Sequence, residues 1–176
     1  MRKFLFLFLC SLSSLCFGLE DRQLGEYSFE WDKEVDAEEA LSVMKKSFLI
    51  GYSNFTSEEL KVASIEEALE ASSKKELELR KKDEIDWLVV KHNQEVIGFC
   101  ILESGNNAEN IYVRQMAILP EYQRTGIGRR VAQVILTNFP KVSKVLAVTR
   151  VQKKVSQNFL TSLGFQPSDY MHEGYS

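Results

Sequence analysis

The chain has 176 residues, 44% of them hydrophobic, with 22 Lys and Arg against 25 Asp and Glu and a formal net charge of −3. This length and apolar share predict one compact domain that needs no metal or disulfide to stabilise its core. The charge argues against nucleic acid as a partner and slightly favours a cationic substrate such as an amine, although solubility alone explains a charge of this size.

The N-terminus has the pattern of a secretory signal peptide. Two basic residues precede an apolar run over residues 4–17, and the small residues Cys16 and Gly18 are spaced as a signal peptidase requires. Cleavage after Gly18 would leave residues 19–176 as a single domain with a charge of −5, because residues 1–18 contain two basic residues and no acidic one. The run is shorter than the roughly 20 residues that span a bilayer, so no permanent membrane anchor is expected. The predicted location is periplasmic or secreted, with a cytoplasmic protein as the alternative.

Cysteine usage predicts no disulfide. Only Cys100 would remain after signal cleavage, and one cysteine cannot close an intramolecular bridge. Its strand-like surroundings favour a buried small hydrophobic side chain over a reactive thiol.

Short patterns predict the elements of the first half of the chain. Residues 28–31 are typical of a short strand, and a capping-box pattern of Asp36 with Glu39 predicts a helix over residues 36–48. Thr56 and Glu59 form a second such pattern, which predicts a longer helical region. The charges of residues 74–84 alternate in sign, which indicates a solvent-exposed helix face.

The second half is typical of a sheet. Residues 87–91 and 96–102 flank a turn and predict a β-hairpin, and a turn at residues 105–107 leads to a strand over residues 111–119. Residues 145–149 predict a further strand, parallel to the previous one because a helix lies between them.

A bulge or polar cleft is expected within the strand at 111–119, because Arg114 and Gln115 interrupt its apolar run. Residues 123–128, Gln-Arg-Thr-Gly-Ile-Gly, then lie between this strand and a helix. The two glycines let main chain approach a ligand without Cβ obstruction, and the helix presents unpaired amides and the positive end of its dipole. This arrangement predicts a cradle for a diphosphate. The further glycine of a Rossmann fingerprint and the Lys-Ser/Thr pair of a Walker loop are both missing.

Residues 116–128, Met-Ala-Ile-Leu-Pro-Glu-Tyr-Gln-Arg-Thr-Gly-Ile-Gly, resemble the acyl-CoA-binding motif of the GNAT N-acetyltransferase superfamily. A second family element, an amphipathic helix that ends in Leu-Gly-Phe, is matched over residues 155–165. The resemblance implies an α/β (α+β) fold with a mixed, mostly antiparallel central sheet flanked by helices. In it, a splayed parallel strand pair holds acyl-CoA.

The resemblance further implies an N-acetyltransferase that uses acetyl-CoA and no metal. An amine of a small molecule, peptide or protein would attack the thioester directly, without a covalent enzyme intermediate. Pantetheine would lie as an extra strand against Met116, Ala117 and Ile118, with a main-chain NH near Ile118 polarising the thioester carbonyl. The expected diphosphate-binding residues are Gln123, Arg124, Thr125, Gly126, Ile127, Gly128 and Arg129.

The catalytic groups of the family are not matched. Leu160 stands where many members carry a Tyr that protonates the departing thiolate, and Lys153 stands where an Asn commonly contacts pantetheine. Tyr112 occupies the central-strand position at which some members carry a Glu base. It is a weak catalytic candidate beside its simpler interpretation as a core-edge aromatic. These departures leave a catalytically weak CoA-binding domain, or an interaction module, as alternatives.

Export also conflicts with the supply of acetyl-CoA, which is a cytosolic metabolite. Either the protein acts in the cytosol of another cell, or its N-terminal segment is not a working signal.

Overall fold

The computed structural model describes residues 3–9, 27–31, 37–60, 62–82, 84–104, 109–150 and 153–168. In these residues seven strands form one sheet in the order β2-β3-β4-β5-β6-β1-β7. The strands are β1 (Lys3–Leu9), β2 (Tyr27–Trp31), β3 (Asp86–His92), β4 (Glu95–Ser104), β5 (Asn110–Ile118), β6 (Lys144–Arg150) and β7 (Gln166–Ser168). The helices are α1 (Ala37–Tyr52), α2 (Ser57–Leu60), α3 (Ile65–Lys81), α4 (Ile127–Asn138) and α5 (Lys154–Ser162), with a 3-10 turn η2 (Pro120–Tyr122).

The sheet is mixed and mostly antiparallel, as expected. Every neighbouring pair is antiparallel except β5 and β6, which run parallel because α4 connects them. The hairpin of β3 and β4 turns at Asn93 (φ 51°) and Gln94 (φ 72°). Two successive residues with positive φ match the twist of the flanking strands. The predicted hairpin is confirmed.

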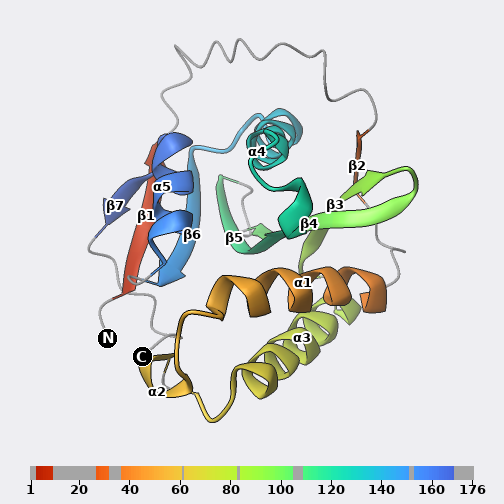
Figure 1. The fold of residues 1–176 in the computed structure, drawn as a ribbon. Helices are drawn as coiled ribbons and strands as arrows, with labels where there is room; N and C mark the ends of the chain where they lie inside the picture. Colours follow the sequence, from red (N-terminus) through yellow and green to blue (C-terminus); the bar gives the residue numbers. More distant parts are fainter. Residues whose placement is uncertain are drawn as a thin grey trace.

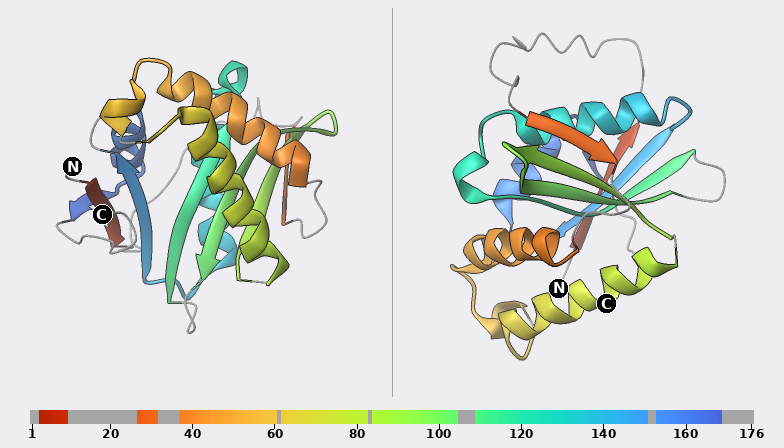
Figure 2. Two further views of the ribbon diagram at one scale, coloured as in Figure 1. Left: turned by 90° about the horizontal axis from the view of Figure 1, so that it is seen from below. Right: turned by 90° about the vertical axis from the view of Figure 1, so that its right-hand side faces the viewer.

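Helices cover both faces of the sheet and form two cores (Figures 1 and 2). Strand β3 shows the division, because successive side chains point to opposite faces. Leu88 and Val90 are fully buried in the core that includes α4, whereas Val89 is fully buried in the core that includes α1. Phe99 and Met44 are the largest fully buried side chains of the core that includes α1.

The helical region predicted to begin at Thr56 is two helices. Thr56 and Glu59 do form a capping box, with the Thr56 amide donating to Glu59 Oε2 (2.8 Å) and the Glu59 amide to Thr56 Oγ1 (3.1 Å). However, α2 ends at Leu60, and Ser64 caps α3 by accepting from the Glu67 amide at 3.0 Å. The capping residue predicted for α1, Asp36, lies outside the described residues.

The charged stretch of residues 74–84 is not wholly exposed. Lys74 pairs with Glu70 on the surface at 3.0 Å, as the alternating pattern predicts. Glu76, by contrast, is only 3% exposed and binds Arg114 of β5. The expectation was wrong at this residue because a charge pattern along one helix contains no information about a cation on a distant strand.

Residues 3–9 of the predicted signal peptide form β1, the strand between β6 and β7. All seven residues of β1 pair with β6, and β7 pairs with β1 alone. Residues 10–18 lie outside the described residues, as do the predicted turn at 105–107 and the chain after 168. None of the described helices is both long and apolar enough to cross a membrane. Cleavage of the segment stays a prediction.

Candidate active site

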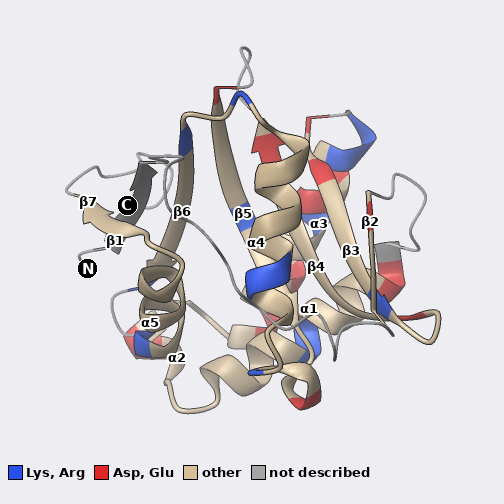
Figure 3. Ribbon diagram, turned by 90° about the horizontal axis from the view of Figure 1, so that it is seen from above, with Lys and Arg blue, Asp and Glu red and all other residues tan. Residues whose placement is uncertain are grey.

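Strands β5 and β6 separate about halfway along their length. They pair in parallel only from Asn110 to Val113 of β5, opposite residues 144–147. The next residue, Arg114, is a bulge, since Leu102 of β4 pairs with Val113 and Ile101 pairs with Gln115. The predicted bulge is therefore confirmed. Beyond it, residues 115–118 pair with β4 on one side only, and Figure 3 shows the two strands diverging from their N-terminal ends.

The loop after β5 presents a row of unpaired main-chain donors. It enters α4 through Arg124 (φ 65°) and Gly126 (φ 91°), and Gly126 is the N-cap residue without a side-chain cap. The amides of residues 124–128 donate to no partner in the part of the chain that the structure describes. Consecutive unpaired amides at a helix N-terminus form a concave anion site, strengthened by the helix dipole. This loop is hereafter the amide cradle.

Two side chains of the predicted diphosphate-binding set also hold the amide cradle in shape. Thr125 Oγ1 donates to the Tyr122 carbonyl at 2.7 Å, and Gln123 Nε2 donates to the Ile118 carbonyl at 2.8 Å. Ser47 Oγ of α1 donates to the same Ile118 carbonyl at 3.0 Å. The loop is therefore fixed to β5 and α1 before any ligand binds.

The second glycine of the motif serves close packing. A Cβ atom on Gly128 would lie 2.9 Å from Cζ of Phe159 on α5. Gly126 has open space around the corresponding position, but its positive φ disfavours any other residue. One glycine thus brings α4 and α5 together, and the other permits the turn.

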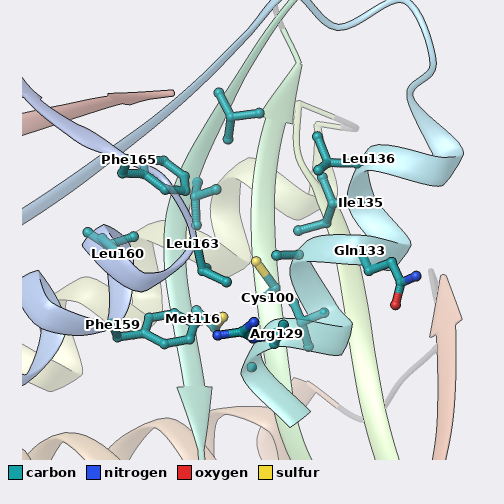
Figure 4. Close-up of a pocket in the computed structure, with 15 residues that line it drawn as sticks. Cys100, Met116, Arg129, Gln133, Ile135, Leu136, Phe159, Leu160, Leu163 and Phe165 are labelled. Carbon is teal, nitrogen blue, oxygen red and sulfur yellow. The ribbon is translucent and has the colours of Figure 1, made fainter. Parts of the chain in front are cut away.

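An apolar cavity of about 60 Å³ lies between α4 and α5, and its lining includes Gly128 at the end of the amide cradle (Figure 4). Its wall includes Cys100, Met116, Arg129, Phe159 and Leu160. An apolar cavity that lies beside an anion site and the separated strands suits a ligand with a phosphate end and a weakly polar arm.

Cys100 is not the reactive group of this cavity. Burial raises the pKa of its thiol to about 12, so almost no thiolate exists near neutral pH. We expect a Cys10→Ser/Cys16→Ser variant to react with a thiol reagent at pH 8 only after denaturation. Rapid labelling of the native variant, followed by absorbance, would contradict the buried placement.

A larger cavity, of about 330 Å³, lies on the opposite face of the sheet, under α1, α2 and α3. It shares four lining residues with the first cavity: Val113, Met116, Phe159 and Leu160. The two cavities are therefore adjacent, separated by these side chains, where β5 and β6 diverge. We call the larger one the acceptor cavity.

The polar wall of the acceptor cavity joins α3 to β5. Arg114 Nε and Nη2 donate to both carboxylate oxygens of Glu76, at 2.9 and 3.1 Å, and Nη1 donates to Glu103 at 2.5 Å. Burial alone would lower the pKa of the guanidinium, but the hydrogen bonds and charges of these carboxylates raise it overall. Gln115 Nε2 extends the network to Ser72 Oγ at 2.8 Å. The arrangement is bidentate and rigid.

The sequence motif located the amide cradle but not this cavity. Met116 lines both cavities, Ala117 is buried in the α1-side core, and Arg129 lines the smaller cavity. The candidate Tyr112 pairs with Leu146 where the strands are still joined and lines neither cavity, while Leu160 lines both. Arg150, the last residue of β6, was not predicted as a site residue, and Lys153 was identified only as a departure from the Asn that is common in the family.

Comparisons with known proteins agree with this geometry. The model of the acetyltransferase (GNAT) family matches residues 52–165. A PaiA N-acetyltransferase from Thermoplasma acidophilum, solved with coenzyme A, superposes with a TM-score of 0.70 at 20% identity, covering 82% of this chain and 92% of that one. The ribosomal-protein-S18-alanine N-acetyltransferase of Escherichia coli superposes with a TM-score of 0.60 at 15% identity, covering 85% and 86%. A search of curated proteins gave no match. The chain belongs to the GNAT family of acetyltransferases.

Proposed function

We propose that the protein transfers the acetyl group of acetyl-CoA to an amine by direct attack on the thioester. The observation that carries this proposal is the amide cradle beside the gap between β5 and β6. Amides of residues 124–128 would bind the diphosphate, and the edge of Met116, Ala117 and Ile118 that faces away from β4 would bind pantetheine. The side chains of Gln123 and Thr125 maintain the loop.

The acceptor enters from the other face in this proposal. An amine in the acceptor cavity would reach the thioester carbonyl at Met116, which lines both cavities. Holding both reactants beside the point where β5 and β6 diverge would supply proximity, which is a large part of what such a transfer needs. Leu160 cannot donate a proton there, so the thiolate would take its proton from another group or from water. Loss of one general acid typically costs 10²- to 10⁴-fold and does not abolish turnover.

A CoA-binding domain without turnover is the second candidate, favoured by Leu160 in the lining of both cavities. Calorimetry with acetyl-CoA, followed by a thiol-release assay across an amine library, separates the two. We expect saturable binding and release of free CoA that depends on the amine. Binding without release under any amine would favour the second candidate, and flat heats would refute both.

We also propose export through residues 1–18, with a full-length cytoplasmic protein as the alternative. The signal-like pattern supports export, whereas the pairing of β1 with β6 and β7 supports retention. Removal of β1 would leave β7 without its strand partner. Intact mass spectrometry of the protein from each compartment of its native cell decides, because a full-length cytosolic species would refute export.

A further inference from the structure

We propose that the acceptor amine belongs to a small molecule that also carries a carboxylate or phosphate, and that Arg150 and Lys153 bind this anion. The inference rests on the acetyltransferase function proposed above and specifies its second substrate.

The acceptor cavity has an excess of positive charge. Three cationic side chains line it, those of Arg114, Arg150 and Lys153, and its lining includes no Asp or Glu. Arg114 is neutralised from outside by Glu76 and Glu103. For Arg150 and Lys153, no carboxylate partner exists in the described part of the chain.

Both cations are held in place rather than extended into solvent. Arg150 Nη1 donates to the Leu60 carbonyl at 3.1 Å, which leaves other guanidinium donors available. Lys153 Nζ lies 3.5 Å from the ring centroid of Tyr52 on α1, and the Arg150 guanidinium lies 5.9 Å from that same ring. A Cβ on Gly51 would approach Lys153 Nζ to 2.7 Å, so the missing side chain makes room for the ammonium.

Two partly buried positive charges close together, those of Arg150 and Lys153, destabilise each other, and a bound anion would offset this repulsion. Burial, assisted by the neighbouring charge of Arg150, lowers the pKa of Lys153 to about 8. An anion between the two cations would favour the protonated lysine and satisfy charge-assisted hydrogen bonds. A polyamine would meet repulsion at the same place. Net charge slightly favours a cationic substrate, but the acceptor cavity itself favours an anionic group.

The cavity also limits the size of the acceptor. Its volume of about 330 Å³ is near the lower end of small-molecule sites. Phe48, Leu69 and Met116 contribute apolar side chains to its lining beside the cations. A primary amine joined by a short apolar spacer to an anionic group fits these features.

Matched pairs of amines test the proposal. Lysine and cadaverine differ by one carboxylate, and phosphoethanolamine and ethanolamine differ by one phosphate; comparing the two pairs distinguishes the source of the anion. We expect kcat/KM for the anionic member of at least one pair to be higher by about tenfold or more, the size of one charge-assisted hydrogen bond. Arg150→Gln and Lys153→Gln should each reduce this preference, whereas Lys154→Gln, an exposed neighbour, should not. Equal rates within both pairs, or a preference unchanged in both variants, would overturn the proposal.

A second measurement does not depend on turnover. Competitive labelling with acetic anhydride at graded pH, read by peptide mass spectrometry, gives the pKa of Lys153. Glutarate and inorganic phosphate are the anionic probes, and glutaramide is the neutral control. We expect an anion to raise this pKa by about one unit or more and glutaramide to leave it unchanged. If an anion raises the pKa of Lys153 but no amine releases CoA, the acetyltransferase function is refuted and the anion site is kept. If an amine releases CoA but no anion raises this pKa, the anion site is refuted and the acetyltransferase function is kept.

Discussion

Gly126→Glu should weaken acetyl-CoA binding by about 100-fold or more, because it places a carboxylate beside the amides proposed to bind the diphosphate. Gly126 caps the N-terminus of α4 with φ 91°, and a Cβ atom there meets open space, so a new side chain fits within the cradle's own loop without a clash at Cβ. Like charge then opposes the ligand where the helix dipole otherwise attracts it. Isothermal titration calorimetry at constant ionic strength measures the change in Kd.

Gly126→Gln is the matched control. Both substitutions require a left-handed backbone at a residue with a Cβ, which costs about 1 kcal/mol, and their side chains have the same length. Their Tm values should therefore be similar, whereas Kd should be weakened much more by Glu than by Gln. If the two variants weaken Kd equally, the altered loop shape and not the added charge causes the loss of affinity. Unchanged Kd in both would remove the amide cradle from the binding site.

Local patterns explain why the cradle could be predicted from the sequence. The turn of β3 and β4, the glycines of residues 126–128 and the bulge at Arg114 each depend on residues within a few positions of one another. Such features depend on backbone conformation and period-2 or helical spacing, which one sequence displays directly. The parallel placement of β6 also followed, since a helix must connect it to β5.

The acceptor cavity could not be predicted in the same way. Its wall combines Phe48 of α1, Leu69 of α3, Arg114 of β5 and Lys153 before α5, and no spacing in the chain connects them. Glu76 was expected to be exposed for the same reason, since its partner Arg114 is 38 positions away in the chain. The insertion of β1 between β6 and β7 was likewise hidden, since an apolar run serves equally as a signal peptide or as a central strand.

Glu76→Ala should lower the free energy of unfolding by about 3–5 kcal/mol, the cost of leaving one partner of a buried ion pair uncompensated. Arg114 would keep only Glu103, whose side chain is 47% exposed, and Gln115 would lose a contact as well. Glu103→Ala is the matched control and should cost about 1 kcal/mol or less, because solvent screens that pair. Urea unfolding followed by circular dichroism gives both values.

A double variant separates pairing from packing at the same site. Replacing both partners, as in Glu76→Leu/Arg114→Met, removes the two charges together and should recover most of the stability lost in Glu76→Ala. Similar losses for Glu76→Ala and Glu103→Ala would contradict the buried placement of Glu76.

Because the ion pair joins α3 to the bulge where β5 leaves β6, Glu76→Ala should also raise the KM for the acceptor amine. Acetyl-CoA affinity should change little, since the amide cradle follows the C-terminal end of β5 and is fixed through Ile118 rather than through Arg114. The fold therefore uses separate contacts to stabilise its two proposed substrate sites.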